Sequence, residues 1–312
     1  IFSKAGGGKS LCKNESVLIK DKKGKVKLIK IGGLVEEIIK KKGIDFTDEE
    51  LEGKTFPGFS VWTFDENMKG EWGEVKIAAR KKAPETFYKF KTKSGREITT
   101  TGDHNLVALQ NGQINLLKGE DVKVGDFIPL PRNIAIDSVS KKQPLILKGI
   151  QVDSPEFLRL AGFITAEGTV LEKKTLISNT EKEVLDVIEN DLNFLKIKFT
   201  RMKNKVGDVR GIYTGIGNFT DNVKKMGGLA KSGEKRVWPF VFGLKKEQIR
   251  HYLSAYFEGD GGVESSREIT ATSKSKELIS DISFLLYYFG IVCRIKEIKK
   301  EMKEAVEQYD FE

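Results

Sequence analysis

Two short segments with the same pattern constrain this chain more than any other feature of its sequence. Leu160–Gly168 reads Leu-Ala-Gly-Phe-Ile-Thr-Ala-Glu-Gly, and Leu253–Gly261 reads Leu-Ser-Ala-Tyr-Phe-Glu-Gly-Asp-Gly. Both mix small residues with large apolar ones, which predicts two helices that pack with their backbones close together. Both end in an acidic residue and a glycine, so Glu167 and Asp260 are expected at the same end of the helix pair. Two carboxylates placed in this way can share divalent metal ions.

The repeat continues beyond these two segments, as a search for internal repeats shows. Leu176–Ile197 aligns with Ile269–Ile291, with one inserted residue in the second copy. Each copy predicts a short strand, an amphipathic helix and an apolar strand. Because the unit occurs twice, the pattern indicates a duplicated domain and excludes a solenoid.

The two segments and their flanks resemble the LAGLIDADG homing endonucleases in their two-copy, single-chain form. Residues 235–242, which read Lys-Arg-Val-Trp-Pro-Phe-Val-Phe, are also similar to that family. The resemblance covers residues 151–296 and implies an α+β endonuclease domain with a pseudo-twofold αββαββα repeat. It also implies site-specific hydrolysis of double-stranded DNA, with Mg²⁺ as the cofactor and Glu167 and Asp260 as its ligands.

The chain departs from that family at two positions near the implied metal and attacking water. Glu167 replaces the commoner Asp, which moves the carboxylate oxygens by roughly an ångström, against Mg²⁺ distances of about 2.0–2.1 Å. Lys274 matches a basic position that the family uses near the attacking water, but the corresponding position of the first copy falls near Thr180. A surface lysine at a helix N-terminus is an equal interpretation of Lys274.

The family's strands lie in the DNA major groove, where base edges are most distinguishable. The corresponding candidates in this chain are Thr169–Ser178, Lys203–Tyr213, Glu264–Thr272 and Arg294–Lys300. Residues 201–210 alternate charged residues with small and apolar ones, which is typical of a DNA-facing ribbon and equally of any exposed hairpin.

Length, charge and cysteine content limit the class of protein. A chain of 312 residues predicts two domains, and a net charge of +9 with a pI of about 9.2 favours an acidic polymer as a partner. Cys12 and Cys293 are the two cysteines, which excludes a disulfide framework and favours a reducing, cytoplasmic location. The sequence has no apolar run long enough to span a membrane and no signal-peptide pattern, so no membrane partner is expected.

The first part of the chain predicts an all-β domain, because short strand-like runs recur at hairpin spacing. These runs are Ser16–Ile19, Val26–Lys30, Val61–Thr63, Val75–Ala79, Thr86–Thr92 and Gly95–Leu109. Gly33–Lys42 has helical periodicity, and Gly119–Pro131 predicts a turn followed by a strand. A change of composition across residues 134–150 predicts a linker to the second domain.

Several motifs of this first part follow one another in the order of the N-terminal splicing motifs of inteins. They are Cys12, then residues 95–106 with Thr101-Gly-Asp-His104, then Gly119-Glu-Asp-Val-Lys-Val-Gly-Asp126. The tail Gln308-Tyr-Asp-Phe-Glu312 resembles the strand motif before an intein's C-terminal junction. This resemblance covers residues 12–312, and the endonuclease-like segment lies where inteins carry it.

The intein resemblance implies an all-β splicing domain with a Hint-like horseshoe, joined to the endonuclease domain. It also implies the domain boundaries that follow. Residues 1–11 are the remnant of the flanking host protein, or N-extein, which is the second expected partner besides DNA. Residues 12–133 are the N-terminal part of the splicing domain, 134–150 the linker, 151–296 the endonuclease, and 297–312 an incomplete C-terminal strand of the splicing domain.

The intein resemblance also implies a role for each of five residues. Cys12 is the nucleophile that converts the preceding amide into a thioester, and His104 protonates the amide nitrogen of Cys12. Thr101 hydrogen-bonds the peptide that is cleaved and helps to hold it strained. Asp103 is placed to tune His104, although an Asp in a β-turn is more often a turn-former. Asp310 assists proton transfers between steps, and an exposed acid at a strand end is its equal alternative.

The two ends of the sequence carry further expectations. Inteins end in His-Asn followed by Cys, Ser or Thr, whereas this sequence stops at Glu312, so we expect thioester formation and thiol cleavage at Leu11–Cys12 without complete splicing. Residues 5–10, Ala-Gly-Gly-Gly-Lys-Ser, resemble the end of a phosphate-binding loop whose first glycine is Ser3 here. We interpret them as a host ATPase sequence that the insertion interrupts.

Two other functions compete with an active intein endonuclease. A splicing domain with an inactive insert that binds DNA weakly or not at all is favoured by Glu167 and by the missing basic partner of Lys274. A hedgehog-like autoprocessing module or a pure DNA-binding regulator is disfavoured, because motifs of both domains occur together in the intein order.

Overall fold

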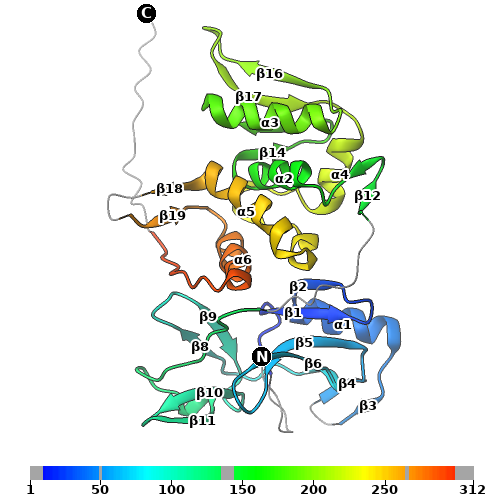
Figure 1. Cartoon of the computed structure of the whole chain (residues 1–312). Coiled ribbons are helices and arrows are strands. Elements are labelled where there is room, and N and C mark those ends of the chain that lie inside the picture. Colours follow the sequence, from blue (N-terminus) through cyan, green and yellow to red (C-terminus); the bar gives the residue numbers. More distant parts are fainter. Residues whose placement is uncertain (1–9, 49–50, 135–143, 264–266, 299–312) are drawn as a thin grey trace, which may run out of the picture.

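The computed structural model describes residues 10–48, 51–134, 144–263 and 267–298. Figure 1 shows two parts, with residues 10–134 in the lower half of the view and residues 144–263 in the upper half. Within these described ranges, no helix is both long enough and apolar enough to cross a membrane.

The first part is built mainly from antiparallel hairpins. One sheet has the strand order β2-β1-β5-β6, formed by β1 (Ser16–Asp21), β2 (Val26–Lys30), β5 (Phe59–Phe64) and β6 (Gly70–Glu74). A second has the order β3-β4-β7, formed by β3 (Phe46–Thr47), β4 (Leu51–Thr55) and β7 (Ile77–Lys81). Two hairpins complete this part, β8 (Tyr88–Lys91) with β9 (Glu97–Thr100) and β10 (Asn105–Gln110) with β11 (Gln113–Lys118).

The helix α1 (Ile31–Lys42) follows β2, as its periodicity predicted. Leu34, Val35 and Ile38 form its buried face and pack in a small cluster with side chains of β1. Three lysines lie in its last turn, where positive charge is favourable against the negative end of the helix dipole. The helix ends at Gly43, which has a positive φ of 76° that glycine adopts without strain.

The second part alternates helices with short strands. The helices are α2 (Pro155–Glu167), α3 (Lys182–Phe194), α4 (Asn218–Met226), α5 (Lys246–Asp260) and α6 (Lys276–Leu286). One sheet has the order β14-β15-β17-β16, formed by β14 (Gly168–Val170), β15 (Thr175–Ser178), β16 (Phe199–Lys203) and β17 (Val209–Thr214). After α5, β18 (Gly261–Val263) pairs with β19 (Ile269–Ala271).

The predicted helix pair is confirmed: α2 and α5 pack side by side, and the sequence sets where each begins and ends. Ser154 caps α2 by accepting the Phe157 N–H at 3.3 Å, and Pro155 follows at the first helical position. Each helix ends at the acid-Gly step that begins a strand. A Cβ atom on Gly162 would lie 2.3 Å from the Tyr252 carbonyl oxygen, so the two backbones approach as the small residues predicted.

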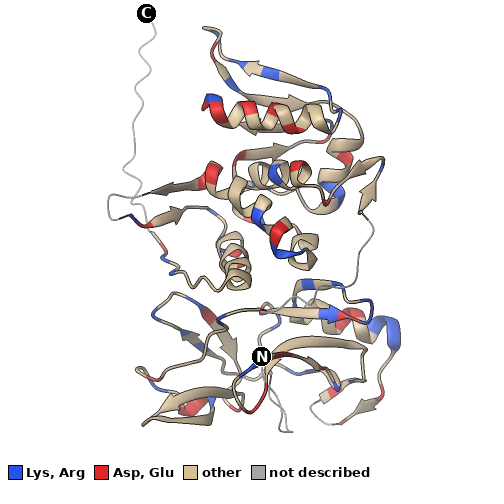
Figure 2. Ribbon diagram, in the orientation of Figure 1, with Lys and Arg blue, Asp and Glu red and all other residues tan. Residues whose placement is uncertain are grey.

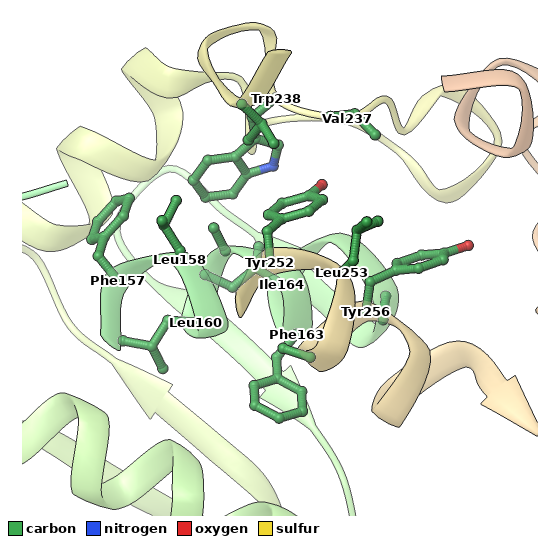
Figure 3. Close-up of a cluster of buried hydrophobic side chains, with 14 of the residues drawn as sticks. Phe157, Leu158, Leu160, Phe163, Ile164, Val237, Trp238, Tyr252, Leu253 and Tyr256 are labelled. Atoms are coloured by element: carbon green, nitrogen blue, oxygen red, sulfur yellow. The ribbon is translucent and has the colours of Figure 1, made fainter. Parts of the chain in front are cut away.

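The main hydrophobic core surrounds this helix pair. Figure 3 shows side chains of α2 and α5 gathered beneath Trp238, which is 2% exposed. The Trp238 ring meets the Phe157 ring edge-on, with 6.2 Å between their centroids. Within the core, the Tyr252 hydroxyl satisfies its hydrogen-bonding capacity with the Thr165 hydroxyl at 2.7 Å.

The first part also contributes to this core and forms ion pairs with α6. Val26 of β2 is buried in the same hydrophobic cluster as the helix pair. Two adjacent residues in the first turn of α6 carry opposite charges and pair across the boundary: Lys276 Nζ lies 2.6 Å from Glu97, and Glu277 lies 2.7 Å from Lys30 Nζ. Because all four side chains are at least partly exposed, these pairs orient the two surfaces more than they stabilise them.

The turn between β8 and β9 is held against residues 287–295. A Cβ atom on Gly95 would lie 1.9 Å from the Ile295 carbonyl oxygen, so this approach requires glycine. The Ile295 N–H donates a hydrogen bond to the Ser94 carbonyl at 2.8 Å, and the Arg96 guanidinium lies 4.6 Å from the centre of the Tyr287 ring. The strand β9 therefore begins at a contact with the second part.

The first part differs from its predicted architecture in three ways. The expected horseshoe is not evident, because the strands divide into several small sheets and α1 makes this part mixed α/β. The predicted strand Val75–Ala79 is split, since Val75 and Lys76 connect β6 to β7 in a different sheet. After Gly119–Asp121, a short 3₁₀ helix, the expected strand is reduced to one isolated bridge between Leu109 and Phe127.

The pseudo-twofold repeat is recognisable in the helices and unequal in the strands. Within the described residues, the first copy contributes four strands to one sheet and the second copy contributes two. Residues 294–298, predicted as part of a DNA-facing strand, form no strand, and residues 264–266 and 299–300 lie outside the described ranges. Residues 146–151 of the linker region form a hairpin, β12 (Ile146–Leu147) with β13 (Ile150–Gln151), whose Leu147 carbonyl accepts from Asn222 of α4 at 2.7 Å.

We predict that Gly162→Ala lowers the free energy of unfolding by about 1–3 kcal/mol, because the new methyl forces α5 away from α2. Gly33→Ala is the matched control, since Gly33 lies in α1 and nothing lies within 4 Å of the place that its new methyl would occupy. That variant is expected to be neutral or up to about 1 kcal/mol more stable. Urea unfolding measures both, and an equal response of the two variants would contradict the close helix contact.

Candidate functional site

The segment Ser10–Cys12 runs antiparallel along the end of β9. The Thr101 N–H donates to the Ser10 carbonyl at 3.0 Å, and the Cys12 N–H donates to the Thr99 carbonyl at 3.0 Å. Leu11 forms an isolated bridge with Thr100. The Leu11–Cys12 peptide therefore donates its own N–H to β9, and the peptide before it accepts a hydrogen bond from Thr101.

Thr101 is 2% exposed, and its hydroxyl contacts the segment that precedes Cys12. It accepts the Ser10 N–H at 3.2 Å and donates to the Ser10 carbonyl at 3.3 Å. The Thr101 hydroxyl therefore hydrogen-bonds Ser10. The sequence predicted a hydrogen bond to the Leu11–Cys12 peptide, which lies one residue later.

His104 is 4% exposed and lies in the turn that joins β9 to β10. Its N–H donates to the Thr101 carbonyl at 3.1 Å, and its carbonyl accepts the Gly119 N–H at 2.8 Å. The backbone of His104 is thereby fixed to the same residue that holds Ser10. Thr101 and His104 therefore lie in the turn after β9, and Cys12 is hydrogen-bonded to Thr99 of that strand.

Asp103 pairs with Lys81, whose ammonium nitrogen lies 3.6 Å away. Partial burial would raise the pKa of Asp103, but hydrogen bonding to Thr101 and the charge of Lys81 outweigh it and hold that pKa below its usual value. Asp103 therefore remains ionised at neutral pH beside a lysine.

Asp310, the remaining predicted residue of the splicing part, lies outside the described residues.

The second candidate site lies where α2 and α5 end. Glu167 is the last residue of α2 and Asp260 the last of α5, and both carboxylates are half-buried. A Cβ atom on Gly259 would lie 2.7 Å from Ala166 Cβ and 3.5 Å from Glu167 Cγ, so the two helix ends touch. The sequence prediction that both acids share one end of the helix pair is consistent with this placement.

Burial governs the charge of both acids. Burial raises the pKa of Glu167, and it raises the pKa of Asp260 to about 6, with a further contribution from the nearby Glu167 carboxylate. Both groups also stand at the C-terminal ends of helices, where the helix dipole disfavours negative charge. The site therefore attracts a cation.

Lys235, to which sequence reasoning gave no role, brings a positive charge to these acids. Its Nζ donates to the Ala166 carbonyl at 2.8 Å at the end of α2, and its own carbonyl accepts the Ser275 hydroxyl at 2.6 Å. Burial lowers the pKa of Lys235, while the Asp260 and Glu167 charges act to raise it. The only sequence signal was its position at the start of residues 235–242, which resemble the family.

Asn179 orients Glu167. Its side-chain amide donates to Glu167 Oε2 at 2.8 Å, and its own oxygen accepts the Glu181 N–H at 2.8 Å, which fixes the amide in one orientation. Lys274 by contrast is exposed and lies two residues before α6 begins. Lys235 thus supplies a positive charge beside both acids, where the sequence had suggested Lys274.

The acids fit a hard divalent cation by their chemistry. Within the described ranges, no group of three or more His, Cys, Asp or Glu residues is arranged to hold a metal ion. Glu167 and Asp260 nevertheless supply carboxylate oxygens, which Mg²⁺ prefers, at a half-buried place between two negative helix ends. A bound cation would relieve the unfavourable burial of both charges.

The sheet beside this site carries basic residues on strands that were predicted to face DNA or to form an exposed hairpin. Figure 2 shows basic residues along β16. Arg201 of β16, however, turns towards α3, where its guanidinium binds Glu189 at 2.5 and 2.7 Å. Lys174 lies 5.8 Å from the centre of the Tyr213 ring of β17. Arg201, one of the charges in residues 201–210, is therefore engaged by α3.

Comparison with known proteins gives one matching family and several relatives. The model of the LAGLIDADG-like domain matches residues 247–309, which include the second acid-Gly motif. The chain is 29% identical over 90% of its length to the RNA polymerase subunit Rpo1C of Methanocaldococcus jannaschii, and it covers 36% of that protein. From the same organism, the replication factor C small subunit is 28% identical over 94% of the chain, and transcription initiation factor IIB is 25% identical over 95%.

The chain spans only a fraction of these relatives, 14% of the replication factor subunit and 40% of transcription factor IIB.

Solved structures similar to the chain are described as inteins. A transcription factor IIB mini-intein is 26% identical, with a TM-score of 0.38 over 43% of this chain and 74% of that one. The PabCDC21-1 intein is 24% identical, with a TM-score of 0.35 over 39% of this chain and 72% of that one. The predicted resemblance to LAGLIDADG proteins and to inteins is confirmed.

We predict that Thr101→Val loosens Ser10, because it removes a buried hydroxyl that serves both the N–H and the carbonyl of Ser10. The loss of these hydrogen bonds is expected to cost about 1–3 kcal/mol of stability. Amide hydrogen exchange at Ser10 should become faster in the valine variant and stay near wild type in Thr101→Ser, which keeps the hydroxyl. Equal exchange in both variants would contradict the contact.

Proposed function

The chain is similar to inteins and carries a LAGLIDADG-like domain, and on that premise we propose that it is an intein that combines protein splicing with a DNA endonuclease. The observation that supports the splicing activity is the seating of Ser10–Cys12 along β9, which places a thiol next to a peptide fixed on both sides. The relatives support it too, because proteins with three different names share one sequence unit that fills only part of each.

The first step is an acyl shift from nitrogen to sulfur. Cys12 Sγ attacks the carbonyl carbon of Leu11, an S–C bond forms, and the C–N bond of the Leu11–Cys12 peptide breaks. The thiol's proton is balanced by the proton that the Cys12 nitrogen gains when it becomes an amine. Such a shift is uphill for an ordinary amide, so the site must hold the peptide near the attacking geometry and protonate the leaving nitrogen.

Residues of β9 and the turn after it meet these two requirements, which are to hold the peptide and to protonate the leaving nitrogen. Hydrogen bonds from β9 and Thr101 fix the backbone around the peptide, so that the Cys12 side chain attacks from a defined direction. His104 is the proton donor in this proposal, because it is a buried imidazole anchored to Thr101 and its ordinary pKa lies near neutrality. Asp103 is engaged by Lys81, and we assign it the role of fixing the turn.

The second proposed activity is site-specific hydrolysis of double-stranded DNA at the end of the helix pair. A divalent cation, Mg²⁺ by preference, supplies an activated water and neutralises charge on the phosphate when bound. Glu167 and Asp260 would hold it, Asn179 keeps Glu167 oriented, and Lys235 places a positive charge beside both acids. A target duplex of DNA and the flanking host protein are the proposed partners.

An inactive insert that binds DNA weakly is the second candidate function. Two observations favour it: Lys274 is exposed, and within the described residues the second copy offers two strands where the first offers four. A two-sided DNA-binding surface needs both copies, so this imbalance weakens recognition in the second half.

The splicing proposal predicts that excess small thiol releases the fragment ending at Leu11 and lowers the intact mass accordingly. Cys12→Ala should abolish this cleavage, and His104→Ala should slow it by about 10²–10⁴-fold, the usual contribution of a general acid. Cys293→Ala is the matched control, because it removes the other cysteine and should leave the rate unchanged. An unchanged mass of the wild-type chain, with Cys12 still open to alkylation, would refute the splicing activity.

The endonuclease proposal predicts Mg²⁺-dependent nicking of supercoiled plasmid DNA. Glu167→Gln and Asp260→Asn should each lower the rate by at least about 100-fold, since each removes a charged metal ligand. Glu258→Gln is the matched control, an exposed acid in α5 two residues before Asp260. Absence of Mg²⁺-dependent nicking by the wild-type chain would instead support the inactive insert.

A further inference from the structure

Glu15 lies three residues after Cys12, and its side chain folds back onto the strand that holds the junction. Glu15 Oε1 accepts the Thr99 N–H at 2.9 Å, and the Thr99 carbonyl accepts the Cys12 N–H at 3.0 Å. The Glu15 N–H in turn donates to the Cys12 carbonyl at 2.9 Å. One carboxylate thus closes a ring of hydrogen bonds that runs from Cys12 through Thr99 and back.

We propose that Glu15 is a positioning residue of the N-terminal junction: it fixes the Thr99 residue whose carbonyl fixes the Cys12 nitrogen. This inference rests on the proposed acyl shift at Cys12. Without Glu15, the Thr99 N–H would lose its side-chain acceptor. Thr101, two residues further along the chain, would still hold Ser10. Glu15 secures the Cys12 side of the peptide, and Thr101 secures the Ser10 side.

The surroundings of Glu15 favour its hydrogen bond to the Thr99 N–H over hydration of the carboxylate. The side chain is half-buried, and burial raises its pKa, which the Thr99 N–H and the charge of Lys30 partly offset. Lys30 itself pairs with Glu277 at the N-terminal turn of α6, and Glu277 also pairs with Arg236 at 3.1 Å. A carboxylate kept in such a place serves a backbone N–H that an apolar side chain would leave unpaired.

The chemical consequence concerns the geometry of attack. The Cys12 nitrogen is the leaving group of the shift, and its position relative to Cys12 Sγ and the Leu11 carbonyl decides whether the peptide lies in a reactive arrangement. A misplacement of about 1 Å in such a site costs on the order of 100-fold in rate. Loosening Thr99 moves this nitrogen without touching the nucleophile or the proton donor.

The test compares Glu15→Ala with Glu15→Gln in the full chain, by the rate of thiol cleavage and by amide exchange at Cys12 and Thr99. Alanine removes the acceptor, so we expect cleavage roughly 10- to 100-fold slower and faster exchange at both amides. Glutamine keeps an oxygen acceptor and loses the charge, so it should restore both readouts to within about threefold of wild type. Rescue by glutamine separates positioning from a requirement for the negative charge.

Asp65→Ala is the matched control, since the Asp65 carboxylate also accepts backbone N–H groups, from Asn67 at 2.9 Å and Lys69 at 2.8 Å, in the turn between β5 and β6. It should change neither cleavage nor exchange at Cys12. Wild-type rates in Glu15→Ala would overturn the inference, and so would a glutamine variant as slow as alanine. A wild-type chain that thiol does not cleave would instead refute the acyl shift, and amide exchange at Cys12 and Thr99 would still test Glu15.

Discussion

The direct backbone contact between α2 and α5 at Gly162 is the constraint on which the second part depends. A side chain there would meet the Tyr252 carbonyl, so glycine allows the two helices to pack at their closest within the aromatic core. The same closure brings the two helix ends together. Glu167 and Asp260 become neighbours because the helices that carry them cannot separate, although the two residues belong to different copies of the repeat.

The electrostatic character of that helix end follows from burial. Two half-buried acids at negative helix ends resist ionisation, as the raised pKa of Asp260, about 6, expresses. Lys235 relieves part of this cost, and its backbone is held by Ser275 from the start of α6. Three segments far apart in the chain therefore meet at the end of the helix pair, where Lys235 lies beside the two acids.

The two parts of the molecule meet at the strand that holds the proposed splice junction. The turn before β9 reaches the second part through Gly95, which approaches the Ile295 carbonyl, and Glu97 of β9 pairs with Lys276 of α6. Two residues further along β9, Thr99 receives the Cys12 N–H. The second part therefore supports the strand against which the Leu11–Cys12 peptide rests, which links the packing of the LAGLIDADG-like part to the geometry of the proposed splicing site.

The sequence by itself determined the helix pair, the two terminal acids and the order of Cys12, Thr101 and His104, because these depend on local periodicity and on motifs within one segment. The hairpins of the first part were also predicted, since strand and turn propensities act over few residues. Tertiary structure alone decided the division into small sheets, the unequal strands of the two copies, and the place of Lys235 beside the acids. These features depend on contacts between residues distant in the chain, which local patterns of charge and hydrophobicity do not encode.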